Sequence, residues 1–155
     1  ITILIDSLPL LDFTKIGKII IVGEMAYPVE IPAQFNKVQL VNKWLSNEEF
    51  DRYVNETDFL LMPYIEATQS GIAAVSIGYG KPAIVTRVGA MEEQFTENAA
   101  YFMFDVSVKA LVDSIMYACS DKKKYERVQK ELNVLSKKYT WENLGEKLSN
   151  YILRS

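Results

Sequence analysis

The sequence predicts an α/β fold in which a parallel sheet is covered by helices on both faces, giving three layers. Short runs of β-branched and apolar residues alternate along the chain with segments of helical spacing. The short runs are apolar at nearly every position, as expected of strands buried on both faces. The chain has 155 residues, of which 49% are hydrophobic and 24% charged, which is typical of one globular domain with a core.

Five short strands are expected, all in the first two thirds of the chain. The first dozen residues, ITILIDSLPLLD, have helix-like spacing that Pro9 interrupts, and the first strand follows them. Residues 25 to 35 carry two prolines and no clear period, which indicates a loop. The expected strands are KIIIVGE, KVQLV, DFLLMPY, PAIVT and AYFMF.

Capping residues indicate where the helices begin and end. Ser46 and Glu49 have the spacing of a capping box, ahead of a helix that ends near Asn55. SGIAAVSIGYG predicts a helix of small residues that ends at Gly80, because glycine readily adopts the left-handed conformation that closes a helix. MEEQF predicts a short helix before the last strand. The C-terminal part is helical throughout, and its candidate N-caps are Ser107, Asp121 and Thr140.

The composition argues against several kinds of site and partner. The net charge is −3, so there is no general electrostatic reason to bind nucleic acid. The absence of histidine excludes a His-dependent triad or a His metal site within the chain. The single cysteine, Cys119, cannot form an internal disulfide and is expected to pack within a helix, which favours a reducing, cytoplasmic location. One cysteine also cannot form the cysteine cluster of a structural zinc site.

The start of the chain leads us to expect a fragment of a longer protein. The first residue is Ile, inside an apolar run, and no basic segment precedes it as in a signal peptide. No apolar stretch approaches the roughly 20 residues needed to span a bilayer. The sequence shows no internal repeat and no second domain, so residues 1–155 are expected to form a single domain.

The carboxyl ends of the predicted strands form the edge where ligands bind in open α/β sheets. The loop YIEATQSG leads into the small-residue helix, whose N-terminus presents free N–H groups and a partial positive charge. Gly71 leaves the backbone open to a ligand, so this segment is either a phosphate cradle or a helix start capped by Thr68 or Ser70. Glu66 either accepts hydrogen bonds from sugar hydroxyls or is simply exposed.

Two further segments lie on the same predicted edge. In VTRVGAMEE, Arg87 either faces an anion or is solvated, and Gly89 allows a backbone conformation that other residues avoid. Trp44 follows the second strand and either stacks on a base or, as we favour, packs below the loop. The chain has neither GxxxxGK[ST] nor GxGxxG, so phosphate binding would depend on the helix terminus.

The stretch PYIEATQSGIAAVSIGYGKPAIVTRVGAMEE resembles the signature of family 4 glycosyltransferases of the GT-B fold. The segments KIIIVGE and NKWLSNEEFDRYVNETDFLLMPY resemble the flanks of that signature, so the similarity covers nearly the whole chain. TQSG resembles a variant of members that build bacterial surface polysaccharides. The positions that match the signature are Pro63, Glu66, Gly71, Gly80, Pro82, Thr86, Val88, Gly89 and Glu93.

The resemblance implies a Rossmann-like C-terminal domain that holds a nucleotide-sugar donor of the UDP or GDP type. The acceptor-binding domain, the first strand of the donor domain and its basic diphosphate contacts would all precede Ile1, so the isolated chain is expected to be inactive. The resemblance further implies metal-independent, retaining transfer to a saccharide or lipid-linked acceptor. It places the full protein in the cytoplasm, with peripheral association at the inner face of the membrane.

The match departs from the family at the paired glutamates, which usually lie about eight positions apart and contact the donor sugar and the ribose. Glu66 matches the sugar-contacting glutamate approximately, but Val75 stands where the ribose-contacting glutamate is expected, and valine cannot hydrogen-bond a ribose. Ala90 replaces the second glycine of the family's V-G-G turn. Glu66 is thus the candidate catalytic residue, and the candidate donor-binding residues are Lys43, Trp44, Thr68, Gln69, Ser70, Gly71, Ile72, Arg87, Gly89 and Ala90.

Two other functions fit the same fold class. A nucleotide-sugar epimerase of GT-B fold predicts catalytic carboxylates and usually histidine, which this chain lacks. A non-catalytic, flavodoxin-like binding module predicts a self-contained sheet that opens with its own first strand, whereas this chain opens on a helix-like segment.

Overall fold

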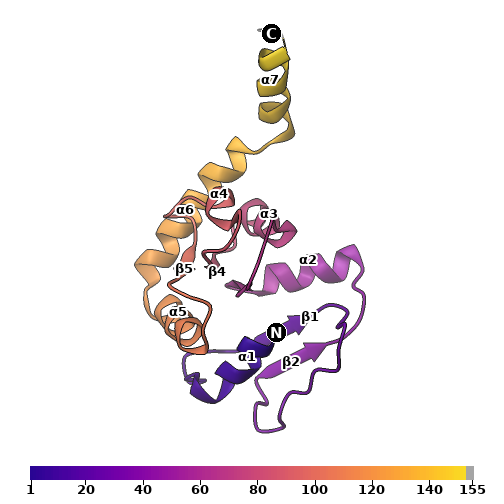
Figure 1. Cartoon of the computed structure of the whole chain (residues 1–155), viewed down its shortest axis with the longest axis vertical. Coiled ribbons are helices and arrows are strands. Elements are labelled where there is room, and N and C mark those ends of the chain that lie inside the picture. The colour runs from indigo at the N-terminus through magenta and orange to yellow at the C-terminus, as the bar shows by residue number, and fades with distance from the viewer. Residues whose placement is uncertain (153–155) are drawn as a thin grey trace.

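The computed structural model describes residues 1–152, apart from the side chains of residues 141, 147 and 148. Each predicted strand and helix is found close to its expected position, which confirms the α/β class (Figure 1). The strands are β1 (Ile19–Val22), β2 (Val38–Val41), β3 (Leu60–Met62), β4 (Ala83–Thr86) and β5 (Tyr101–Met103). The helices are α1 (Thr2–Ser7), the 3-10 turn η1 (Leu8–Leu10), α2 (Asn47–Glu56), α3 (Gly71–Tyr79), α4 (Met91–Gln94), α5 (Val108–Ser120), α6 (Lys122–Lys138) and α7 (Trp141–Ile152).

All the strand pairs within the described residues are parallel, as predicted, but they form two sheets. β1 pairs with β2, and β4 lies between β3 and β5. No described strand joins β1 to β3, so each of these two strands has one edge without a strand partner in residues 1–152. The apolar runs in the sequence predict the strands but do not reveal this division, because strand pairing is a long-range property of the fold.

The core lies around the central strand β4, all four residues of which are buried. α5 packs against α1 on one side of the molecule, and α3 packs against α6. In contrast to these packed helices, α7 projects away from the rest of the chain (Figure 1). None of the helices in residues 1–152 is both long and apolar enough to cross a bilayer. The side chains that fill the core completely include Met62, Ile84, Val85, Phe95, Met103, Leu111 and Leu132.

The predicted helix ends are confirmed by their hydrogen bonds. Ser46 Oγ accepts from the Glu49 N–H at 3.2 Å, and Glu49 Oε2 accepts from the Ser46 N–H at 3.1 Å, which completes the capping box. Gly80 ends α3 in the left-handed conformation, with φ of 63°. The remaining predicted N-caps each accept a hydrogen bond from the first turn of their helix: Ser107, Asp121 and Thr140.

The prediction that Cys119 packs within the protein is wrong. Cys119 lies on α5 but is exposed. The buried stripe of α5 is formed by neighbouring positions of the same helix, including Ile115 and Ala118. A residue adjacent to that stripe in sequence is rotated about 100° away from it, because an α-helix has 3.6 residues per turn.

We expect Ser46→Ala to lower the free energy of unfolding by about 1 kcal/mol, because the Glu49 N–H loses its acceptor at the start of α2. Chemical denaturation measures the change. Glu56→Ala serves as the control, since Glu56 is exposed in the last turn of the same helix, and it should change the stability by less than about 0.5 kcal/mol. Equal stability of Ser46→Ala and the unmodified chain would show that the cap is not formed in solution.

Candidate functional site

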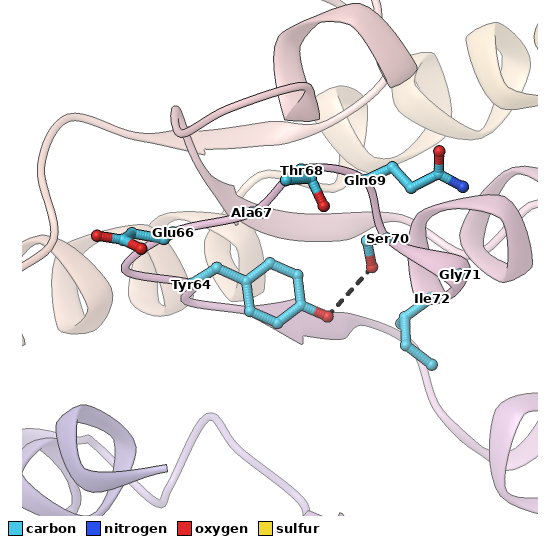
Figure 2. A pocket seen from close by; sticks show the side chains of 8 residues that line it. All are labelled: Tyr64, Glu66, Ala67, Thr68, Gln69, Ser70, Gly71 and Ile72. Carbon is cyan, nitrogen blue, oxygen red and sulfur yellow. Dashed lines mark hydrogen bonds between the residues drawn. The ribbon is translucent and has the colours of Figure 1, made fainter.

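The loop that joins β3 to α3, residues 64–70, is tied at both ends by hydroxyl groups. At its start, Thr86 Oγ1 donates to the Tyr64 carbonyl oxygen at 2.7 Å, and Thr86 is buried at the end of β4. The Tyr64 hydroxyl then lies 3.1 Å from Ser70 Oγ, which Figure 2 shows as a dashed line across the base of the loop. We call residues 64–70 the binding loop.

Ser70 caps α3 and still leaves donors free at the helix N-terminus. Ser70 Oγ accepts from the Ala73 N–H at 3.4 Å, and the Ser70 N–H donates to Gln94 Oε1 at 3.0 Å. Within residues 1–152, the N–H groups of Gly71 and Ile72 have no acceptor. The segment can therefore be both a capped helix start and a phosphate cradle. Ser70, not Thr68, is the cap, and two N–H groups remain for an anion.

Two open hollows adjoin the binding loop. The first, of about 460 Å³, extends along the loop onto the first turn of α3 and is lined by Tyr64 and by residues 66 to 72. The second, of about 560 Å³, lies between the loop and the turn after β4, where Ile65, Val88 and Gly89 line it. Glu66, Ala67 and Thr68 line both hollows.

Glu66 lies at the end of the binding loop that is distant from α3. Figure 2 shows its carboxylate pointing away from Gly71 and Ile72. Glu66 is exposed and has no hydrogen-bond or ion-pair partner among the described residues. The loop thus presents an acceptor at one end and two N–H donors at the other.

The turn after β4 packs backbone against backbone on the binding loop. Gly89 has φ of 54°, which confirms that it adopts a conformation unfavourable for other residues. A Cβ atom placed on Gly89 would lie 1.5 Å from the Ala67 carbonyl oxygen. Glycine is therefore required at this position for two reasons: φ is positive, and there is no room for a side chain next to Ala67.

The charge of Arg87 is compensated by its own surroundings. Its guanidinium donates to the carboxylates of Glu92 and Glu97 and lies 4.2 Å from the centre of the Phe102 ring. The hydrogen bonds to Glu97 and Glu92 raise the pKa of Arg87 above its usual value, and the Arg87 guanidinium lowers the pKa of Glu97. An anionic ligand would have to compete with two carboxylates for this cation.

The residues after β2 lie outside both hollows. Lys43 pairs with Glu49 of the α2 capping box at 2.5 Å. The preference for a packed Trp44 is wrong, because the side chain is 83% exposed. An aromatic residue in a loop is buried only if another element covers it, and no described element covers Trp44.

The structure brings together most of the predicted site residues but not all of them. Val75, where the resemblance expects a ribose-binding glutamate, is half-buried and lines neither hollow. Tyr64 belongs to the binding loop and Gln94 contacts it, but neither was predicted as a site residue, because an isolated tyrosine or glutamine has no distinctive sequence spacing. The predicted residues that line a hollow are Glu66, Thr68, Gln69, Ser70, Gly71, Ile72 and Gly89, whereas Lys43, Trp44, Arg87 and Ala90 line neither.

Comparisons with protein-family models and with curated proteins find no match.

Comparison with solved structures does find similar folds. HepE of Anabaena, solved in complex with UDP-glucose, has a TM-score of 0.76 at 13% identity, and the match covers 99% of this chain and 45% of HepE. Sucrose-phosphate synthase of Thermosynechococcus elongatus has a TM-score of 0.72 at 16% identity, with 99% of this chain and 42% of the synthase covered.

A third structure is itself an isolated domain. The C-terminal domain of a group 1 family glycosyl transferase, LpcC of Francisella tularensis, has a TM-score of 0.59 at 14% identity, with 68% of this chain and 54% of that structure covered. This chain thus spans about half the length of the structures that it resembles. At these identities the likeness shows the fold alone, which is a Rossmann-like α/β fold of the kind found in each half of GT-B glycosyltransferases.

Proposed function

We propose that this chain is the nucleotide-sugar-binding domain of a glycosyltransferase. The observation that carries the proposal is the binding loop. Among the described residues, two N–H donors at the start of α3 and the Glu66 carboxylate at the other end of the loop have no partner. Diphosphate oxygens accept hydrogen bonds from backbone N–H groups, and sugar hydroxyls donate to carboxylates. The structural likeness to HepE, which was solved with UDP-glucose, supports the same assignment.

The chemistry follows from where charge develops during sugar transfer. When the bond between the sugar and the diphosphate breaks, negative charge grows on the departing diphosphate. In the proposed complex, the Gly71 and Ile72 N–H groups and the N-terminal end of the α3 dipole would stabilise this charge. Glu66 would hold the sugar so that its reactive carbon faces the acceptor. We propose a UDP- or GDP-type donor, a saccharide or lipid-linked acceptor, retention of configuration and no metal.

We further propose that the domain works as the C-terminal half of a longer cytoplasmic protein, associated peripherally with the membrane. The unpaired edges of β1 and β3 support this arrangement, because a strand from outside these 155 residues could pair with them. The acceptor would then be held by an upstream domain. We expect the isolated chain to bind the donor without transferring sugar, and detection of transfer by the isolated chain would contradict this.

Calorimetric titration with UDP, GDP, their hexose conjugates and flavin mononucleotide tests the proposed function. We expect a nucleoside diphosphate and its sugar conjugate to bind. Binding of flavin alone would instead support the flavodoxin-like module.

Glu66→Ala should weaken binding of the nucleotide-sugar about tenfold and change binding of the bare nucleotide little. A hydrogen bond to a charged group contributes about 1.5–3 kcal/mol, and only the sugar conjugate makes this contact in the proposed complex. Calorimetry with UDP-glucose and UDP measures both affinities. Glu126→Ala on α6 removes the same charge from an exposed residue that lines neither hollow, and it should alter neither affinity. An equal loss for UDP and UDP-glucose would show that Glu66 is not the sugar contact.

A further inference from the structure

Gln94 pairs with the backbone of Ser70 through both polar atoms of its side-chain amide. The Ser70 N–H donates to Gln94 Oε1 at 3.0 Å, and Gln94 Nε2 donates to the Ser70 carbonyl oxygen at 3.1 Å. The two residues are 24 positions apart and belong to different elements, α4 and the N-cap of α3. The amide therefore pairs with Ser70 as a neighbouring strand would, with one donor and one acceptor.

The position of Gln94 is fixed by buried neighbours. Gln94 is the last residue of α4, and its N–H donates to the Ala90 carbonyl oxygen at 3.0 Å. Met91, in the first turn of the same helix, and Phe95, the next residue, are 0% and 1% exposed. Because both are held in the core, the Gln94 side chain starts from a rigid base.

The pairing determines which N–H groups at the start of α3 are free. Gln94 satisfies the Ser70 N–H, and Ser70 Oγ satisfies the Ala73 N–H. Only the Gly71 and Ile72 N–H groups in this turn then remain without an acceptor in the described chain. Without Gln94, the buried Ser70 N–H would lack a partner, and the first turn of α3 could rotate to find one.

We propose that Gln94 is a positioning residue for the binding loop: its amide holds Ser70 so that the Gly71 and Ile72 N–H groups face the ligand diphosphate. The role of the diphosphate rests on the proposed function. The pairing itself does not, so the two can be tested separately.

Gln94→Met and Gln94→Glu test the proposal through UDP affinity. Methionine has a similar length but neither hydrogen bond, so UDP binding should weaken about tenfold at every pH relative to the unmodified chain. The introduced carboxylate, when ionised, accepts from the Ser70 N–H but repels the Ser70 carbonyl oxygen. When protonated, its O–H donates to that oxygen and restores both bonds.

Gln94→Glu should therefore bind UDP weakly at about pH 7.5 and regain affinity toward about pH 4.5, near the usual pKa of a glutamate. Each affinity is divided by that of the unmodified chain at the same pH. Simple charge repulsion of UDP would also disappear on protonation, but it would leave Gln94→Met unaffected. UDP binding by Gln94→Met equal to that of the unmodified chain would overturn the proposal.

Amide hydrogen exchange without any ligand provides the second measurement. In Gln94→Met, the Ser70 and Ala73 amides, which are hydrogen-bonded in the unmodified chain, should exchange faster, while α5 stays unchanged. Gln129→Met on α6 is the matched control, since it removes a side-chain amide whose one hydrogen bond within the described residues goes to the Tyr125 hydroxyl. If the unmodified chain binds neither UDP nor GDP, the proposed function fails, yet unchanged exchange at Ser70 and Ala73 would still overturn the role of Gln94.

Discussion

Gly89→Ala is expected to lower the free energy of unfolding by about 2–5 kcal/mol. The left-handed conformation costs a residue with a side chain about 1–2 kcal/mol, and Gly89 has φ of 54°. The new methyl group would also lie 1.5 Å from the Ala67 carbonyl oxygen, so the backbone must move, and such overpacking typically costs about 1–3 kcal/mol more. The movement opens the contact between the turn after β4 and the binding loop.

Two other glycines separate these contributions. Gly80 also has positive φ, at 63°, but a Cβ atom added there would have no neighbour within 4 Å, so Gly80→Ala measures the conformational cost alone. Gly78 lies inside α3 with open space around it, so Gly78→Ala should stabilise the chain by roughly 1 kcal/mol. Denaturation of the three variants gives the comparison. A Gly89→Ala loss no larger than that of Gly80→Ala would show that the loop and turn are not in contact.

Gly89→Ala should also weaken UDP binding, because the displaced Ala67 lies in the wall of both hollows. Gly80 lies at the opposite end of α3 from the binding loop, so Gly80→Ala should leave UDP affinity unchanged. The ratio of the two affinities is read at a temperature where both variants remain folded.

Phe95→Ala is expected to lower the free energy of unfolding by about 3–5 kcal/mol. The ring is 1% exposed and belongs to the core that also contains Met91 and Met103, so its removal loses buried apolar surface and leaves a cavity. Phe95 directly follows Gln94 at the end of α4, so the loss falls next to the residue that pairs with Ser70.

Phe104→Ala is the matched control, with the same change of side chain at a position that is 98% exposed. It should change the stability by less than about 0.5 kcal/mol. Chemical denaturation of both variants measures the difference. A similar loss for Phe95→Ala and Phe104→Ala would contradict the burial that distinguishes them.

Local signals predicted the elements well because they depend on few neighbouring residues. The capping box of Ser46 and Glu49 and the left-handed end of α3 at Gly80 both follow from backbone chemistry within one helical turn. Signals from single exposed or buried side chains failed. Trp44 and Cys119 were expected to pack and are exposed, since burial depends on what covers a residue and not on its type alone.

The sequence by itself determined the α/β class, the order of the elements and the loop between β3 and α3 as the candidate site. It did so because strand and helix periods, caps and strand-end loops are local properties of the chain. Only the tertiary structure decided that the strands form two sheets, that Glu92 and Glu97 compensate Arg87, and that Gln94 holds Ser70. Those features join distant segments or depend on which way a side chain points, and a pattern read along the sequence contains neither.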